Sequence, residues 1–384
     1  MKVAIIHYWL VGMRGGEKVL EGLCRLFPSA DIYTHVYNPD VISDVIKRHK
    51  IRTTFIQKLP RALHWYNSYL PLMPLALEQI DLRNYDLVIS SESGPAKGVI
   101  TEPEALHVCY CHSPMRYLWD QYFRYLEDRP IYTRAVMRLV FHYLRLYDCA
   151  SSHRVEKYIA NSRYVASRIQ QYWRRDAEVI YPPVDINRFT VTPENDGYYL
   201  WLGKVVRYKK PDLAVEAFNK NGRNLVVLGD GEQLGVVKRM AKKNITFPGA
   251  VDDAAVTRYL EHCKALVFSG VEDFGIVPVE AMACGKPVIA FGRGGVTESV
   301  IEDSTGIFFH ESTPDSLNQA IKRFESMERH FNPTEIRCQA ERFSEALFMD
   351  RMWNVITEAW HSKFGANLPI ANGLKSASAD RKVV

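Results

Sequence analysis

The sequence lacks any long, uninterrupted apolar segment. No window reaches the roughly 18 apolar residues that a membrane-spanning helix needs, and the apolar stretch at 70–77 is interrupted by Pro71 and Pro74. Residues 1–7 enter a strand-like pattern directly, without the apolar stretch of a signal peptide. We therefore expect a cytoplasmic protein that is soluble or lies on a membrane surface.

Cysteines are few and scattered, with seven in 384 residues. An odd number excludes a fully paired disulfide framework and favours a reducing compartment. Cys109 and Cys111 alternate along one predicted strand, but no second Cys or His pair stands at zinc-site spacing. We expect these two cysteines to be buried and structural.

Charge is plentiful but unevenly placed. The charged fraction of 24% and hydrophobic fraction of 47% are typical of a globular protein, and the length predicts two domains. Residues 1–192 hold 25 Lys and Arg against 19 Asp and Glu, or +6, whereas the remainder holds 24 against 25, or −1. Residues 121–175 alone hold 11 basic and 4 acidic residues. The N-terminal half therefore suits an anionic partner.

Short apolar runs alternate with helix-like segments in both halves, a pattern typical of βαβ units and parallel sheets. The predicted strands are 3–7, 32–36, 87–90, 106–111 and 158–161, then 199–202, 225–228, 245–247, 265–269, 288–291 and 307–309. Pro182 and Pro183 mark a boundary. We predict domains at 1–185 and 192–345 joined by a polar linker, a helix at about 345–362 that packs back on the first domain, and a mobile tail at 366–384.

The segment 271–288 carries the strongest motif. A strand end and a tight turn lead into a short helix with Pro278 near its start and Gly285 at its end. The unpaired N–H groups at such a helix start favour an anion. Glu272 and Glu280 frame the turn with seven residues between them. Alternatively, Glu280 stabilises its own helix and Glu272 is simply solvated.

Two further segments could contribute to a phosphate site. The turn at 292–295 opens a second helix and offers another set of N–H donors. Lys204 and Lys209 follow the first strand of the second half, where cations can face a phosphate bound in the crevice. Taken singly, the first segment is by default an ordinary turn and the second a solvated loop.

Together and in this order, these motifs resemble the retaining GT-B glycosyltransferases of family 4, over roughly residues 1–360. The segment 112–120, His-Ser-Pro-Met-Arg-Tyr-Leu-Trp-Asp, is most similar to bacterial mannosyltransferases of O-antigen and surface polysaccharides. The family often has Arg where this chain has Lys204, and lysine lacks the bidentate geometry of arginine. The matching residues are Gly203, Lys204 and Lys209; Gly229, Asp230 and Gly231; Glu272 and Glu280; Gly294 and Gly295; Gly15, Gly16 and Glu17; His112, Ser113 and Pro114; and Ala160, Asn161 and Ser162.

The resemblance implies an α/β GT-B fold of two facing Rossmann-like domains with the donor bound in the cleft between them. It implies that Glu280 binds the ribose and Glu272 the donor sugar, with His112 approaching that sugar from the other domain. Lys204 and Lys209 would neutralise the departing diphosphate. The implied donor site is completed by Gly15, Gly16, Gly203, Gly231, Phe274, Gly275, Ile276, Val277, Gly294 and Gly295. It implies no cofactor and no metal, in line with the lack of an Asp-x-Asp motif beside the donor segments.

We therefore expect transfer of a hexose, mannose from GDP-mannose, to a lipid-linked oligosaccharide in O-antigen or surface polysaccharide synthesis, with no nucleic-acid partner. The alternatives are a GT-B sugar-nucleotide epimerase or phosphorylase, and a non-catalytic nucleotide-sugar-binding assembly protein. A dinucleotide oxidoreductase is disfavoured because the turn at 12–16 does not follow Gly-x-Gly-x-x-Gly spacing.

Residues 131–150 predict an amphipathic helix. At 100° per residue, Arg134, Arg138 and Arg145 fall within an arc of about 40°. Across from this arginine stripe lie the apolar residues Val136, Leu139, Val140, Tyr143, Leu144, Leu146 and Tyr147. One interpretation is an ordinary helix with a solvated basic face. The other is contact with an anionic lipid surface or lipid diphosphate acceptor, which places the protein peripherally on the inner face of the inner membrane.

Overall fold

The computed structural model describes residues 1–127 and 129–369. The chain divides into two compact units. The first comprises Met1–Pro182 and the chain from Phe348 onward, and the second comprises Pro183–Leu347. Residues 183–191 thus belong to the second unit, and most of the predicted tail, 370–384, lies outside the described residues.

The first unit contains a seven-stranded parallel sheet, confirming the α/β prediction for this half. Its strand order is β3-β2-β1-β4-β5-β6-β7. The two outermost strands were not predicted, because one is polar and exposed and the other has three residues. The strands are β1 Val3–His7, β2 Asp31–Thr34, β3 Lys50–Thr53, β4 Leu87–Glu92, β5 Leu106–Cys111, β6 Lys157–Ala160 and β7 Ala177–Val179.

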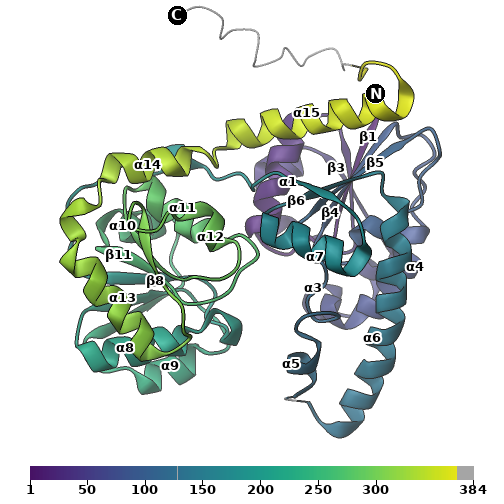
Figure 1. The fold of residues 1–384 in the computed structure, drawn as a ribbon. Helices are drawn as coiled ribbons and strands as arrows, with labels where there is room; N and C mark the ends of the chain where they lie inside the picture. The colour runs from purple at the N-terminus through teal and green to yellow at the C-terminus, as the bar shows by residue number, and fades with distance from the viewer. Residues whose placement is uncertain (128, 370–384) are drawn as a thin grey trace, which may run out of the picture. The chain divides into compact units, whose positions relative to one another are not determined.

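Helices cover both faces of this sheet, so its central strands are buried throughout. Val3 and Ile5 pack with the helix that follows β1 and with the last helix of the chain, while Ala4 and Ile6 pack on the opposite face. Figure 1 shows that last helix, α15, lying beside α1. The helices are α1 Gly15–Leu26, α2 Asp44–Lys47, α3 Ala62–Trp65, α4 Met73–Glu78, α5 Tyr122–Glu127, α6 Ile131–Ser151, α7 Arg163–Trp173 and α15 Glu345–Phe364.

The second unit repeats the plan with a six-stranded parallel sheet in the order β10-β9-β8-β11-β12-β13. All six strands were predicted from their apolar runs. They are β8 Tyr199–Leu202, β9 Leu225–Leu228, β10 Ile245–Gly249, β11 Ala265–Phe268, β12 Val288–Phe291 and β13 Gly306–Phe309. The helices are α8 Pro211–Asn221, α9 Leu234–Met240, α10 Asp253–His262, α11 Ile276–Ala283, α12 Val296–Ser299, α13 Pro314–Ser326 and α14 Pro333–Glu341.

Both sheets reverse their strand order at the centre, at β1/β4 in the first unit and at β8/β11 in the second. In open parallel sheets, ligands bind outside the carboxyl ends of the strands at such a switch point. The chemistry of each unit is therefore expected in the loops that follow these two strand pairs.

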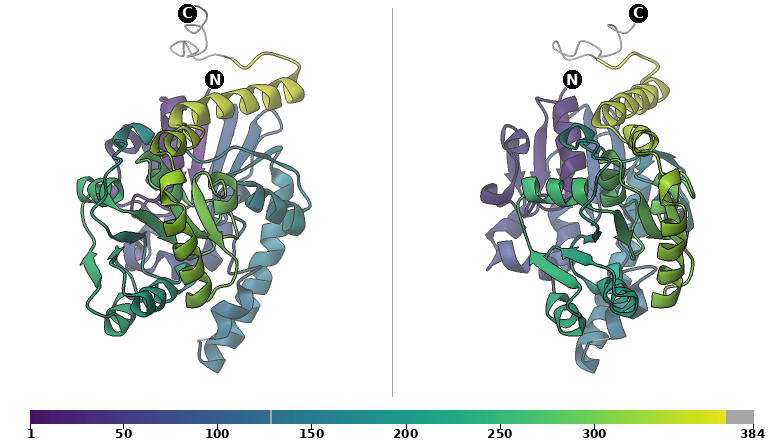
Figure 2. Two further views of the ribbon diagram at one scale, coloured as in Figure 1. Left: turned by 60° about the vertical axis from the view of Figure 1, so that its left-hand side comes forward. Right: turned by 90° about the vertical axis from the view of Figure 1, so that its left-hand side faces the viewer.

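Helix α6 extends well beyond the sheet of the first unit, with α5 beside its first half (Figures 1 and 2). Its 21 residues reach about 30 Å at the usual rise per residue. Only its second half, around Phe141, Leu144 and Asp148, carries buried side chains.

Candidate active site

Lys209 and Glu272 meet at the switch point of the second unit. Lys209 ends the turn after β8, Glu272 lies in the loop after β11, and the ammonium Nζ is 2.8 Å from carboxylate Oε1. Both side chains are about four-fifths buried, at 16% and 20% exposure. Burial disfavours the charge on Lys209, but the adjacent Glu272 carboxylate outweighs it and raises the lysine pKa. Lys209 is therefore a cation held in place at the crevice.

The glycine turn after β12 packs directly on the Glu272 loop. The N–H of Gly295 donates to the Glu272 carbonyl at 3.0 Å, and a Cβ at Gly295 would lie 2.3 Å from the Cα of Phe274. Gly294 adopts φ +82°, which few other residues tolerate. These glycines allow the two loops to touch backbone to backbone. Their spacing therefore has a packing cause as well as the predicted role in phosphate binding.

A second glycine contact supports the Lys209 turn. A Cβ at Gly203 would lie 3.2 Å from Lys209 Nζ, and one at Gly231 would lie 2.4 Å from the Val205 carbonyl oxygen. The loop after β9 thus packs closely on the loop after β8. Lys204 between them is exposed, and its side chain makes no hydrogen bond or ion pair with any described residue, although its carbonyl accepts the N–H of Val206 at 2.9 Å.

Glu280 lies on α11 and is paired with a residue that sequence analysis missed. Arg188 Nη2 donates to Glu280 Oε1 at 3.3 Å, while Nη1 is 3.7 Å from Asp253. The carboxylate of Glu280 is mostly buried, at 19% exposure. Nothing in the sequence indicates this contact, because the two residues are 92 positions apart.

The start of α11 presents backbone groups of the implied donor site. Gly275 precedes the helix with φ +90°, and Ile276 and Val277 form its first two positions. Pro278 at the third position has no N–H, so the unpaired donors come from these three residues. Phe274 is buried with its ring centroid 5.4 Å from that of Phe343, which anchors the turn.

In the first unit, the residues at the switch point form a row of largely buried polar side chains, Glu17, His7, Ser91 and His112, which we call the file. His7 ends β1 and pairs in register with Ser91 of β4. His7 Nδ1 lies 3.0 Å from Ser91 Oγ, which lies 2.8 Å from Nε2 of His112, the residue after β5. His7 Nε2 faces Glu17 Oε1 at 3.8 Å. Sequence analysis identified His112 and, next to the glycine turn, Glu17, whereas His7 and Ser91 match no motif by themselves.

The imidazole of His112 is neutral at physiological pH. Desolvation by the surrounding protein, aided by the neighbouring His7, lowers the His112 pKa to about 3. The backbone N–H of His112 donates to the Glu92 carbonyl at 2.8 Å, which fixes the backbone after β5. His112 thus presents a hydrogen-bonding ring rather than a charge.

Gly15 and Gly16 open helix α1 beside this file. A Cβ at Gly16 would lie 2.2 Å from the hydroxyl of Tyr8, so the glycine lets α1 start against the end of β1. These two glycines and His112 belong to the first unit, whereas the lysines and glutamates of the predicted site belong to the second.

The segment after His112 is held by buried charge pairs. Asp148 of α6 accepts hydrogen bonds from the indoles of Trp119 and Trp173, both at 2.8 Å, and from Lys97, which also pairs with Glu92 at 3.3 Å. Arg168 of α7 bonds Asp120 at 2.9 Å and Ser113 at 3.0 Å. The polar residues of the motif at 112–120 therefore include structural ones.

Helix α6 does not have the solvated basic face that its sequence predicts. Arg134 donates to the carbonyls of Glu127 and Arg129, and Arg145 donates to that of Leu118, so two of the three stripe arginines lie against the protein while Arg138 is exposed. The solvated face is instead apolar. We call it the apolar stripe; it comprises Ile131, Tyr132, Val136, Leu139, Tyr143 and Leu146, which are 49–83% exposed.

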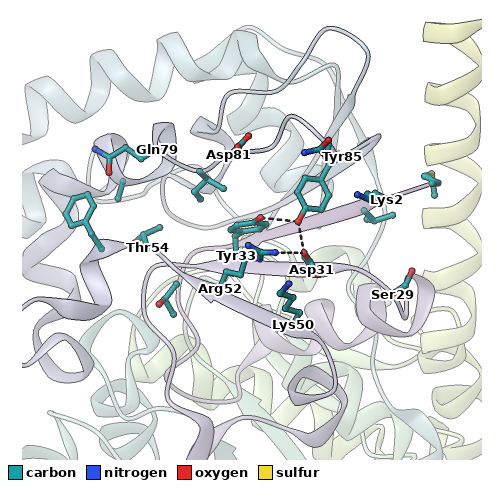
Figure 3. A pocket seen from close by; sticks show the side chains of 17 residues that line it. Lys2, Ser29, Asp31, Tyr33, Lys50, Arg52, Thr54, Gln79, Asp81 and Tyr85 are labelled. Atoms are coloured by element: carbon teal, nitrogen blue, oxygen red, sulfur yellow. Dashed lines mark hydrogen bonds and ion pairs between the residues drawn. The ribbon is translucent and has the colours of Figure 1, made fainter.

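A cavity of about 880 Å³ lies elsewhere in the first unit, at the amino ends of β1 and β2 and along β3 (Figure 3). Asp31 accepts a hydrogen bond from Tyr85 at 2.6 Å, and Tyr85 contacts Tyr33 at 3.0 Å. The cavity lies at the amino ends of the strands, whereas His7 and His112 lie at or after the carboxyl ends. The cavity is therefore separate from the switch point.

Among residues 1–127 and 129–369, no group of three His, Cys, Asp or Glu side chains could hold a metal ion. Cys109 and Cys111 are both buried. No helix in these same ranges is long and apolar enough to cross a membrane.

Two family models match the chain: "Glycosyltransferase Family 4" over residues 13–188 and "Glycosyl transferases group 1" over residues 185–342. An uncharacterized glycosyltransferase of Methanocaldococcus jannaschii is 31% identical over 43% of this chain, an alignment that spans about half (48%) of that relative. The alpha-1,3/1,6-mannosyltransferase ALG2 of Mus musculus is 24% identical over 78% of this chain and 82% of its own length.

A GDP-mannose-dependent alpha-(1-6)-phosphatidylinositol monomannoside mannosyltransferase of Mycolicibacterium smegmatis is 28% identical over 42% of this chain and half of its own. Among solved structures, Anabaena HepE in complex with UDP-glucose superposes with a TM-score of 0.69 at 17% identity, covering 93% of this chain and all of that one. This likeness confirms the GT-B fold. Since the two family models together match residues 13–342, the chain belongs to the family 4 glycosyltransferases.

Proposed function

We propose that this family 4 glycosyltransferase transfers mannose from GDP-mannose to a lipid-linked oligosaccharide, with retention of configuration, in the synthesis of O-antigen or another surface polysaccharide. The buried Lys209–Glu272 pair at the switch point of the second unit is the observation that carries the proposal. The sugar is inferred from relatives named as mannosyltransferases, one of them over most of the chain and one named as GDP-mannose-dependent.

In this reaction the bond from the anomeric carbon to the phosphate oxygen breaks, and a bond from that carbon to an acceptor hydroxyl oxygen forms. The leaving diphosphate takes up the electron pair of the broken bond and its negative charge, and the proton of the acceptor hydroxyl passes to the diphosphate or to water. Lys209 is a cation held before the reaction begins, so it stabilises that charge without reorganisation. The N–H groups at the start of α11 and Lys204 would add to it. Glu272 and Glu280 would hold sugar and ribose hydroxyls.

The charge on the diphosphate is thus met by lysines and backbone N–H groups, and we propose that transfer needs no divalent cation and no cofactor. Addition of EDTA to the full chain should leave the turnover number unchanged. Loss of turnover that Mg²⁺ or Mn²⁺ restores would overturn this part of the proposal.

A thermal-shift panel of GDP, UDP and ADP sugars tests the donor. A ligand at 100 times its dissociation constant stabilises a protein by about 2.7 kcal/mol, so GDP-mannose should raise the melting temperature more than UDP-glucose or ADP-glucose. A larger shift with a UDP sugar would overturn the choice of donor while leaving the enzyme class intact.

Two other functions predict different products. A sugar-nucleotide epimerase would release sugar without any acceptor, and an assembly protein would bind nucleotide without turnover. GDP release that increases with added lipid-linked oligosaccharide, together with a labelled product, supports transfer over both.

We further propose that the protein works at the cytoplasmic face of the inner membrane, with the apolar stripe of α6 as its contact. Residues 129–147 contain four arginines and no Asp or Glu, so the stripe is bordered by positive charge only. An amphipathic helix of this kind binds an anionic bilayer by inserting its apolar face, and each nearby basic residue adds about 1 kcal/mol.

Co-sedimentation with phosphatidylcholine vesicles, with and without phosphatidylglycerol, tests the contact. Leu139→Gln with Leu146→Gln should lower binding at least tenfold, since burying each leucine contributes about 1.5–3 kcal/mol. Leu75→Gln is the control, because Leu75 is 51% exposed on α4 of the same unit. If the wild type binds neither vesicle, or if the double variant binds as well as the wild type, the apolar stripe is not a membrane contact and would instead face another protein.

A further inference from the structure

The file of Glu17, His7, Ser91 and His112 raises a question that the proposed function leaves open: which nitrogen of His112 carries its proton. A neutral imidazole has one N–H donor and one acceptor nitrogen, and the neighbours determine which is which. Nε2 of His112 is committed to Ser91 at 2.8 Å. Among the described residues, Nδ1 has no hydrogen-bond partner, so it is the atom available to a ligand.

Ser91 couples the two histidines. Its hydroxyl bridges Nδ1 of His7 at 3.0 Å and Nε2 of His112 at 2.8 Å. A hydroxyl has a single hydrogen, so Ser91 donates to one ring and accepts from the other. Ser91 is completely buried, which leaves no water to take over either bond. The two tautomers are therefore linked.

Glu17 selects one of the two arrangements. Its Oε1 faces His7 Nε2 at 3.8 Å in a site where both side chains are almost fully buried. A carboxylate only accepts hydrogen bonds, so the proton of His7 is favoured on Nε2 and repelled from Nδ1. The other carboxylate oxygen accepts the N–H of Arg14 at 2.9 Å, which holds Glu17 in place at the start of α1.

The rest of the file follows. With its proton on Nε2, His7 accepts from the Ser91 hydroxyl at Nδ1, and Ser91 then accepts from His112 Nε2–H. We propose that Glu17, His7 and Ser91 are positioning residues that hold His112 as its Nε2–H tautomer, so that its Nδ1 accepts a hydrogen bond from a hydroxyl of the donor sugar. The sugar contact rests on the proposed function, whereas the tautomer does not.

Nitrogen-15 NMR of the histidine-labelled full chain tests the tautomer without any ligand. The wild type should show His112 protonated at Nε2 and unprotonated at Nδ1. In Glu17→Gln, the Arg14 N–H retains the amide oxygen, so the amide NH₂ faces His7 Nε2 and favours an unprotonated nitrogen there. The file then reverses, and His112 should become protonated at Nδ1.

Glu21→Gln is the matched control, because Glu21 is buried on the same helix but pairs with Lys18 at 3.0 Å, away from the file. It should leave His112 unchanged. Ser91→Ala should uncouple the two rings, so that Glu17→Gln no longer alters His112 in that background. A wild-type His112 protonated at Nδ1, or no change in Glu17→Gln, would overturn the assignment.

Kinetics test the sugar contact separately. With GDP-mannose as the probe and GDP release as the readout, Glu17→Gln should lower kcat/KM about two- to tenfold, the range of one neutral hydrogen bond, while affinity for GDP alone stays unchanged. A reversed tautomer with unchanged kcat/KM would overturn the sugar contact, while the assignment of the tautomer would stand. A wild type that turns over no nucleotide sugar would instead refute the proposed function, and the NMR result would still stand.

Discussion

The two units use the same strand order but place opposite chemistry at their switch points. In the second unit, Lys209 and Glu272 form a partly exposed ion pair among glycine-rich loops. In the first unit, His7, Ser91 and His112 form a largely buried file without a free cation. The same scaffold can therefore hold a fixed charge at one crevice and a fixed, neutral hydrogen-bonding geometry at the other.

This difference follows from what surrounds each crevice. The loops of the second unit touch backbone to backbone, which leaves room for charged side chains at their tips. The end of β1 in the first unit is packed under α1 and Tyr8, and burial keeps the neighbouring His112 neutral. We expect substitutions in the second unit to affect charge stabilisation, and those in the first to affect orientation and pH dependence.

The largest expected effect is at Lys209. Lys209→Ala should lower kcat about 100- to 1,000-fold, the range for removing one donor to a developing charge, with a smaller rise in KM because the contribution grows in the transition state. Steady-state kinetics with GDP-mannose would measure both.

Lys220→Ala is the control for that change, since Lys220 forms an exposed pair with Asp315 at 2.9 Å on the same unit. Exposed pairs contribute little, so its kinetics should match the wild type. Near-normal turnover in Lys209→Ala would mean that the buried pair is structural, and the contrast between the two crevices would disappear.

The next effect concerns Glu280. If its carboxylate accepts hydrogen bonds from the ribose, Glu280→Ala should weaken GDP binding by about 1.5–3 kcal/mol, the range for bonds to charged groups. Calorimetric titration of GDP would measure this. Arg188→Ala removes its partner at 3.3 Å but not the carboxylate, so it should have a smaller effect. Equal losses in both variants and in the double variant would assign Glu280 to the ion pair alone.

The third effect concerns the pH dependence of stability in the first unit. In the first unit, burial lowers the pKa of His35 and His112 to about 3 and that of His107 to about 4, and burial raises the Glu92 pKa to about 7. The histidines take up protons near pH 6.5 only when unfolded, so they destabilise the fold as pH falls. Glu92 takes up a proton near pH 7 when folded but near 4.5 when unfolded, which opposes them.

As pH falls, the unfolded state gains up to three protons on these histidines, and the folded state gains one on Glu92. Between pH 6 and 5 the unfolded state therefore binds at most two more protons than the folded state. The free energy of unfolding should then fall by up to about 2.7 kcal/mol per pH unit. Urea titrations of the full chain at several pH values would measure this slope. His35→Gln should reduce it by about one proton, whereas His64→Gln, at an exposed position, should not. If His35→Gln leaves the slope unchanged, His35 does not contribute to the pH dependence of the free energy of unfolding.

Much of the architecture could be predicted from the sequence. The apolar runs at β1, β5, β8, β9 and β12 predicted those strands at their observed bounds, because strands buried on both faces need continuous apolar residues. The edge strands β3 and β7 were missed for the same reason, since they have little to bury. The lysines and glutamates of the second unit were identified because they follow predicted strands and match the motifs of the family that the sequence resembles.

Only the tertiary structure decided which residues that are distant in sequence come into contact, and which face of a helix is exposed to solvent. Arg188 reaches Glu280 over 92 positions, and His7 and Ser91 join His112 through strand register that no local pattern encodes. On α6, amphipathicity gave the two faces but not their direction, because Asp148 and the two tryptophans bound to it turn the apolar face outward. A buried hydrogen bond costs free energy when it is left unmade, so one such network can override the orientation that hydrophobicity alone would choose.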